Sequence, residues 1–336
     1  MNKKTIKLIV LVLTAALLLA AVSCRRNNGG SDPAQQTSVP TEEPPEYANV
    51  APLMWRVTDN AGHTLYLFGT IHVGDDRNKT ALERVSGVLE SCDALAVEFD
   101  VVAYEKNTEQ MMNDLMQYVL TDGSVVSDYM PKELYDRAYE LLREAGLMPS
   151  IYKQYNLAWW AQMVESAMLL VYSDLDPNKA MDSLLIKRAN KSGLRILEVE
   201  SSEFQMGLLN SFDNELYLIL IEAGLAQAET YKTELNKMYE LWLYGDKDAF
   251  WSYLESEDED TGEVEFTEAQ IAMIEDYNRR LLDDRNLGMR DKALQYLASG
   301  ETVFFAVGAA HMANEGGLVQ LLTDAGCTVE TFAYGN

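Results

Sequence analysis

Histidine is scarce in this 336-residue chain, and two of its three histidines occur in the same local pattern. His72 and His311 each follow a glycine by three positions, at the end of an apolar run typical of a buried strand. Glycine permits a tight turn there, so the imidazole can project into a cleft above a sheet. Neutral imidazole is a common ligand of catalytic metals and a general base near neutral pH. The pair therefore favours a catalytic or binding site over two hydrogen-bonded turn residues.

Glu98 ends another apolar run and is expected to reach the same cleft. Two histidines and a carboxylate form an open site for a divalent metal ion, which would polarise a carbonyl or lower the pKa of bound water. The identity of the metal is left open among ions such as Mn, Co and Zn. A solvated strand end is the alternative interpretation of Glu98. His63 lies in an expected hairpin turn and is interpreted as an exposed turn residue.

Two β-α-β units, one near each end of the chain, are the elements expected to position these residues. The first consists of strands over 53–58 and 64–68 joined by a hairpin turn, a helix over 80–91 and a strand over 94–99; the second consists of a strand over 302–307, a helix over 315–325 and a strand over 327–332. Open α/β sheets bind ligands at the carboxyl ends of their strands, so both glycine–histidine loops are expected at one shared cleft.

Residues from about 103 to 300 show apolar side chains at helical spacing, interrupted by one short strand over 194–199. The sequence therefore predicts an α/β fold. Its central mixed sheet is expected to come from the two β-α-β units, N- and C-terminal, with a large, mostly helical middle insertion. This insertion is expected to cover the cleft as a lid.

The first 50 residues predict a signal peptide followed by a disordered tether. Lysines precede an apolar run over 8–22, which is shorter than the ~20 residues that span a bilayer, and small residues then lead into Cys24. This pattern predicts a bacterial lipoprotein signal peptide over 1–23, a lipidated Cys24 and a disordered tether over 24–50. The folded domain is then expected over 51–336, outside the cytoplasm and anchored to the membrane. An ordinary secretory signal or an uncleaved anchor is the alternative.

The charge balance and the cysteines exclude several classes of protein. With 27 basic and 53 acidic residues the formal charge is −26, and so acidic a surface repels the phosphate backbone of nucleic acids. Three cysteines are too few for a cysteine-rich zinc module or a disulfide scaffold. Cys92 and Cys327 are interpreted as buried free thiols, or as a disulfide if their two units lie side by side. The motifs of serine hydrolases, zincins, P-loop proteins and Rossmann proteins are absent.

Five blocks of sequence resemble the TraB/GumN/Tiki family, in the order found there. The blocks are Gly69-Thr70-Ile71-His72, Val97-Glu98-Phe99-Asp100, Met181-Asp182-Ser183-Leu184-Leu185 followed by Val199-Glu200-Ser201 and Gln205, Arg285-Asn286, and Gly308-Ala309-Ala310-His311. The resemblance spans residues 51–336, although the family has Leu-Glu-Thr in place of the Val-Glu-Ser of this chain.

This resemblance implies a metal-dependent hydrolase, because animal members are membrane-tethered proteases. The superfamily also contains erythromycin esterases and haem-binding lipoproteins. His72, Glu98 and His311 are implied as the residues that hold the metal or act on its water. Glu200 and Arg285 are implied as further cleft residues, the carboxylate as a base and the cation as a stabiliser of a developing oxyanion.

Three functions follow from these observations. The first is a membrane-tethered, extracytoplasmic, metal-dependent hydrolase, peptidase-like, acting on a peptide or small-molecule substrate. The second is a lipoprotein that binds haem or another small ligand without turning it over. The third is a metal-free, esterase-like hydrolase in which His72 is the base.

Overall fold

A computed structural model describes residue 47 and residues 49–255, 266–312 and 316–334 of the chain. The expected signal peptide, Cys24 and the tether up to residue 46 lie outside the described residues. No helix within the described ranges is long and apolar enough to cross a membrane.

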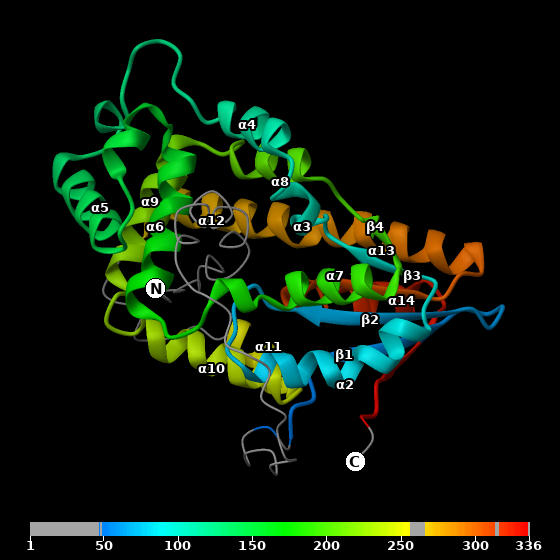
Figure 1. Cartoon of the computed structure of the whole chain (residues 1–336). Coiled ribbons are helices and arrows are strands. Elements are labelled where there is room, and N and C mark those ends of the chain that lie inside the picture. The colour runs from blue at the N-terminus through cyan, green and yellow to red at the C-terminus, as the bar shows by residue number, and fades with distance from the viewer. Residues whose placement is uncertain (1–46, 48, 256–265, 313–315, 335–336) are drawn as a thin grey trace, which may run out of the picture.

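One mixed sheet forms the centre of the fold, with the strand order β4-β3-β5-β2-β1-β6 (Figure 1). The strands are β1 (Met54–Thr58), β2 (Thr64–Thr70), β3 (Ala94–Val97), β4 (Arg195–Glu198), β5 (Val303–Gly308) and β6 (Thr328–Thr331). Strands β4, β3, β5 and β2 run parallel, whereas β1 is antiparallel to both of its neighbours. The predicted α/β class with a central mixed sheet is therefore confirmed.

Strand β5 lies between β2 and β3, so the C-terminal part of the chain completes the N-terminal β-α-β unit. The next strand in the chain, β6, pairs with β1 at the far edge of the sheet and does not pair with β5. The two units are therefore not structural repeats of one another, although each glycine–histidine loop does follow a parallel strand. All side chains of β3 and β5 are buried, as expected for interior strands of a sheet covered on both faces.

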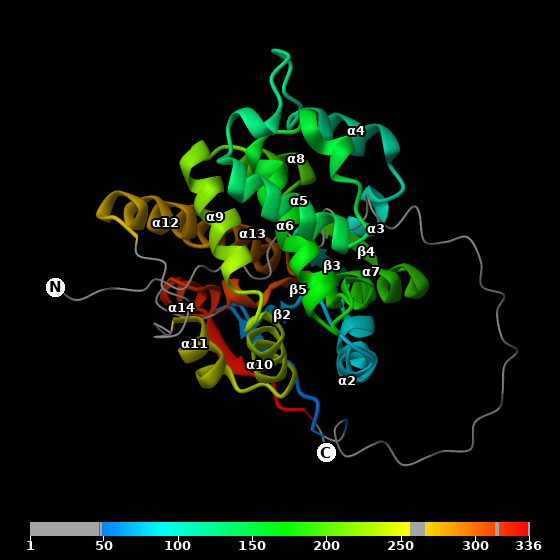
Figure 2. The ribbon, with the colours of Figure 1, turned by 90° about the vertical axis from the view of Figure 1, so that its left-hand side faces the viewer.

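Helices cover both faces of the sheet and one of its ends (Figures 1 and 2). The described helices are α2 (Arg77–Ser91), α3 (Val101–Tyr104), α4 (Thr108–Met116), α5 (Lys132–Glu144), α6 (Leu157–Tyr172), α7 (Met181–Ser192), α8 (Ser202–Leu209), α9 (Asn214–Ala226), α10 (Tyr231–Leu243), α11 (Lys247–Glu255), α12 (Glu268–Leu281), α13 (Asp283–Ser299) and α14 (Leu318–Asp324). In Figure 2, α2 and α7 lie on one side of the sheet, and α13 and α14 lie on the other. The predicted helical middle is confirmed.

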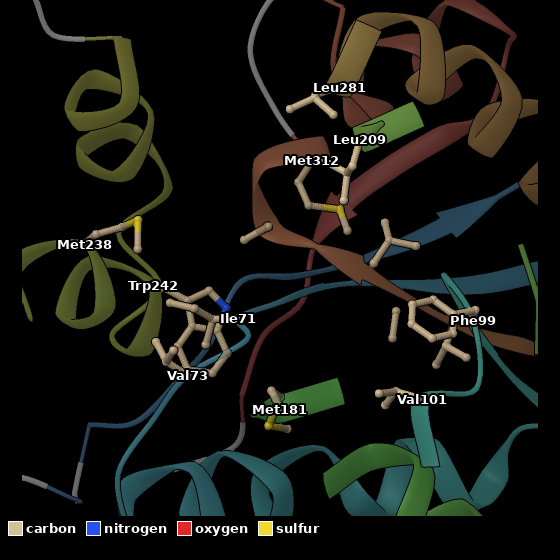
Figure 3. Packing of buried hydrophobic residues seen from close by; sticks show 14 of the residues in the cluster. Ile71, Val73, Phe99, Val101, Met181, Leu209, Met238, Trp242, Leu281 and Met312 are labelled. Atoms are coloured by element: carbon tan, nitrogen blue, oxygen red, sulfur yellow. The ribbon is translucent and has the colours of Figure 1, made fainter. Parts of the chain in front are cut away.

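The helical middle is joined to the sheet next to the first glycine–histidine loop. Trp242 of α10 is buried and donates from Nε1 to the carbonyl oxygen of Gly69 at 2.7 Å. Ile71 and Val73, on either side of His72 in the chain, are buried apolar residues near this tryptophan (Figure 3). This packing fixes the backbone that carries His72.

The two cysteines near the sheet are free thiols. Cys92 and Cys327 are both buried and form no disulfide with each other. Burial raises the pKa of Cys92 to about 12, so its thiol is unreactive near neutral pH. The simpler of the two predictions for these residues is therefore confirmed.

Candidate active site

The carboxyl ends of the four parallel strands lie side by side, and the predicted site residues follow these strand ends. Glu98 follows β3 directly, Glu200 lies two residues after β4, His72 lies two residues after β2, and His311 ends a 3-10 turn (η5, Ala309–His311) after β5. Arg285 reaches the same edge from α13 and bonds to Glu98, 187 positions away in sequence. The topology thus gathers all five predicted residues in one region.

A buried arginine joins the two glutamates. Arg285 is 6% exposed and donates from Nη2 to Oε2 of Glu98 at 2.7 Å and to Oε2 of Glu200 at 2.8 Å. Its Nε donates to Oε1 of Glu200 at 2.9 Å, and its Nη1 donates to the carbonyl oxygen of Leu281 at 3.1 Å. Burial opposes the charge of Arg285, but the two carboxylates outweigh it and raise its pKa above the usual range. The guanidinium is therefore a permanent cation between the carboxyl groups of Glu98 and Glu200.

Both carboxylate oxygens of Glu98 are hydrogen bonded. Oε1 accepts from the backbone N–H of Gly308 at 2.8 Å, at the end of β5. Oε2 accepts from Nε2 of Gln205 at 2.8 Å, in addition to Arg285. Gln205 also donates to Oε2 of Glu200 at 2.8 Å. Glu98 is therefore held rigidly between β3, β5, α8 and α13.

The two histidines lie close enough to Glu98 to affect its ionisation. Burial by itself would raise the pKa of Glu98. The Arg285 cation, together with the positive charge of His72, outweighs burial and holds the pKa of this carboxyl well below its usual range. The structure thus places two imidazoles and one ionised carboxylate together, as the sequence predicted.

His72 is paired with a carboxylate from α7. Its Nδ1 lies 2.8 Å from Oδ2 of Asp182, in the first turn of that helix, where the helix dipole favours a negative charge. A backbone bond of 2.9 Å from the N–H of Met181 to the carbonyl of Ile71 joins the two segments. Burial would lower the pKa of His72, but Asp182 outweighs burial and raises it to about 9. His72 is therefore protonated near neutral pH.

His311 is fully buried and paired with an amide. Its Nδ1 lies 2.7 Å from Oδ1 of Asn286 on α13. Its Nε2 has no hydrogen-bond partner among the described residues. Burial, followed by the Arg285 cation, lowers the pKa of His311 to about 3. His311 is therefore neutral, and one of its ring nitrogens is an unused acceptor.

Some residues of this site suit a metal ion and others do not. The unpartnered Nε2 of His311 is the kind of atom that a metal binds, whereas both oxygens of Glu98 are already hydrogen bonded. In the parts of the chain that the structure describes, no group of three or more His, Cys, Asp or Glu side chains could hold a metal ion. The unpartnered Nε2 of His311 suits a metal, whereas metal binding by His72 and by Glu98 stays a prediction.

Three further residues of the site had no role assigned from the sequence. Asp182, Gln205 and Asn286 fall within the blocks that resemble the family, and this was the only signal for them. Local spacing does not relate any of them to a histidine, because each lies on a helix that the fold brings to the strand ends. His63 lies away from this cluster, with Nδ1 2.9 Å from Oδ2 of Asp59 in the hairpin turn, as expected.

The fold and the cluster define an α/β protein with a buried polar site at the carboxyl edge of its sheet. The chain belongs to the TraB/PrgY/gumN family, whose sequence model matches residues 53–331. This match covers almost the whole described fold and confirms the resemblance drawn from the five sequence blocks. No individually curated protein is a match to the chain.

Proposed function

We propose that this chain is a membrane-tethered, extracytoplasmic hydrolase, peptidase-like in its reaction. It acts on a peptide or small-molecule substrate with a divalent metal ion held by His311 and by His72, which would release its second proton when the ion binds. Membership of the family supports a reaction at these histidines, and Cys24 at the end of the signal pattern supports the lipid anchor. When bound, the ion supplies a Lewis acid that polarises a carbonyl and lowers the pKa of a water molecule.

The observation that carries this proposal is the Nε2 atom of His311. It is buried without a hydrogen-bond partner among the described residues, while Nδ1 of the same ring is bonded to Asn286. Buried polar atoms without partners are rare in proteins, and their position points to a ligand. Histidines that bind metals commonly donate their other ring N–H to an oxygen acceptor. His72 has the same arrangement, with Asp182 as the acceptor.

The ion-pair cluster holds the histidine loops in place. Glu98 accepts from the N–H of Gly308, three residues before His311, so this carboxylate fixes the start of the turn that carries the imidazole. Arg285 keeps Glu98 ionised by lowering the pKa of its carboxyl. Both oxygens of Glu200, the base implied by the resemblance, accept hydrogen bonds from Arg285.

A metal-free hydrolase is the second candidate, and the opposite pKa shifts of the two histidines favour it. Environments that push apart the pKa values of two neighbouring groups define an acid and a base. Neutral His311 would take a proton at Nε2 from the attacking water, and protonated His72 would give one to the leaving group. Because Asp182 keeps His72 protonated, the base in this scheme is His311 and not His72, which was the base expected from the sequence.

Metal content and hydrolysis, measured on the same samples, test the proposal. We expect the purified full chain to contain a divalent metal by elemental analysis and to cleave members of a peptide library. A chelator should abolish this cleavage. His311→Ala should lose both metal and cleavage, whereas His63→Ala, a histidine outside the cluster, should keep both. Circular dichroism checks that each variant is folded.

Equal metal content in His311→Ala and the unaltered chain would contradict the metal site. Cleavage that survives the chelator but is lost in His311→Ala, by about 10²–10⁴-fold, would establish the metal-free candidate instead. Uptake of metal or haem with no cleavage of any substrate would favour the binding lipoprotein.

A further inference from the structure

We propose that Asp182 and Asn286 are positioning residues that keep a proton on Nδ1 of His72 and of His311, so that Nε2 is the ring atom that faces a ligand, as an acceptor in neutral His311 and, in His72, after release of its second proton. The protonation pattern follows from the contacts alone. The use made of the two Nε2 atoms rests on the proposed function.

Asn286 is the clearer of the two cases, because a second contact fixes the orientation of its amide. Its Nδ2 donates to the carbonyl oxygen of Gly316 at 3.0 Å, and a carbonyl oxygen can only accept. Oδ1 therefore faces His311, at 2.7 Å from Nδ1. Since an amide oxygen also only accepts, Nδ1 of His311 must carry the proton and Nε2 the lone pair.

Asn286 can do this because of its place in the fold. It is 1% exposed on α13 and bonds to both His311 and Gly316. The bond to Gly316 thus holds the amide in the orientation that sets the tautomer of His311.

Asp182 gives the same result for His72 with a different kind of acceptor. An ionised carboxylate has no proton to donate, so Nδ1 of His72 must be the donor in their 2.8 Å contact. The adjacent residues are joined by the backbone bond from Met181 to Ile71. This bond fixes the distance between α7 and the loop, and with it the direction of the imidazole. Within the described chain, the hydrogen bond of His72 is made through Nδ1.

The two acceptors differ in charge, and this difference assigns different roles. The anionic Asp182 makes His72 the stronger electron donor, whereas the neutral Asn286 leaves His311 a weaker base. Loss of Asn286 frees the ring of His311 to place its proton on Nε2, which changes that atom from an acceptor into a donor. Loss of Asp182 removes the partner that holds the proton on Nδ1 of His72. Removal of such a supporting partner typically weakens metal binding or activity by about 10–100-fold.

Nitrogen-15 NMR of the full chain, labelled in its three histidines and free of metal, tests the inference directly. The ¹⁵N shifts distinguish protonated from unprotonated ring nitrogens. We expect Nδ1 to be protonated in His72 and His311 of the unaltered chain. Asp182→Leu and Asn286→Leu should each lose this state in the adjacent ring only. Asp182→Asn, which keeps an oxygen acceptor, should retain it in part.

Titration with Co²⁺ gives a second measurement on the same variants. We expect about 10–100-fold weaker binding in the two leucine variants and a smaller loss in Asp182→Asn. Asp59→Leu is the matched control, because it removes the same kind of contact from His63, outside the site. It should leave Co²⁺ affinity unchanged.

An unprotonated Nδ1 in either ring of the unaltered chain would overturn the inference, whatever the variants do. Unchanged ring protonation and Co²⁺ affinity in both leucine variants would overturn it as well. If the rings respond as expected but the unaltered chain neither binds Co²⁺ nor hydrolyses any substrate, the positioning roles stand and the proposed function fails.

Discussion

At the scale of single residues, the site has a closed part and an open part. The closed part is Arg285 with Glu98 and Glu200, whose hydrogen-bonding groups largely satisfy one another. The open part is the pair of imidazoles, where Nε2 of His311 is buried without a partner among the described residues. Breaking a buried ion pair leaves an uncompensated charge, so the closed part stabilises one arrangement of the strand ends. Chemistry is therefore expected at the histidines.

The raised pKa of His72 predicts how the stability of the metal-free chain depends on pH. This pKa is 6.5 for an ordinary histidine and about 9 in the fold. The folded chain keeps a proton that the unfolded chain loses between these values. The stabilisation is complete below pH 6.5 and is lost as the pH rises through 9. We expect the free energy of unfolding, measured with denaturant, to fall by on the order of 3 kcal/mol over this window.

His72→Gln should remove most of this decline, because glutamine does not titrate. His63→Gln should leave the decline intact, because the ring of His63 is on the exposed hairpin. A decline of the same size in His72→Gln and in the unaltered chain would show that another group causes it.

At the scale of elements, a glycine allows β2 and the turn of the second histidine to approach one another. A Cβ atom on Gly69 would lie 3.1 Å from both Cα and Cβ of Ala309 and 3.3 Å from Cγ of Met312. Ala309 begins the η5 turn that ends at His311. The turn that carries His311 thus packs against Gly69 so closely that a larger residue would not fit there. This contact joins the two glycine–histidine motifs.

Gly69→Ala should therefore separate β2 from η5 and weaken the site. Because the two closest atoms are the Cα and the Cβ of Ala309, which cannot move without the backbone, we expect a loss of about 1–3 kcal/mol in the free energy of unfolding, as overpacking of a core causes. Co²⁺ affinity should fall together with stability. Gly87→Ala is the control, since its Cβ would meet no described atom within 4 Å. It should stabilise α2 by about 0.5–1 kcal/mol. Equal stability of the two variants would refute this reading of Gly69.

The sequence predicted the elements more fully than their arrangement. Alternating and apolar runs gave the hairpin of β1 and β2, and the glycine–histidine loops marked two strand ends correctly. The position of β5 between β2 and β3 was not predictable, because interior strands buried on both faces look alike in sequence. The acceptors Asp182 and Asn286 were not predictable from spacing either, since they lie 110 and 25 positions from their histidines.

At the scale of the whole molecule, the sheet and the helical middle share one hydrophobic core. The buried cluster runs from Phe68 and Phe304 in the sheet to Trp242 and Trp160 in the helices. Figure 2 shows these helices standing over one end of the sheet. The helical middle is therefore packed against the strand ends that carry the site, and residues such as Trp242 connect the two.

The net charge of the whole molecule limits how the chain would be held at a membrane. A formal charge of −26 opposes binding to an anionic lipid surface, so electrostatic attraction cannot supply the anchor. Acyl chains on Cys24, at ~0.8 kcal/mol per buried CH₂, would supply the proposed anchor without any help from charge. We expect the full chain, produced in bacteria, to incorporate labelled palmitate and to stay with the membranes through a high-salt wash. Cys24→Ser should lose the label, whereas Cys327→Ser, a buried free thiol, should keep it. A chain that salt alone extracts, or a label that survives in Cys24→Ser, would rule out this anchor.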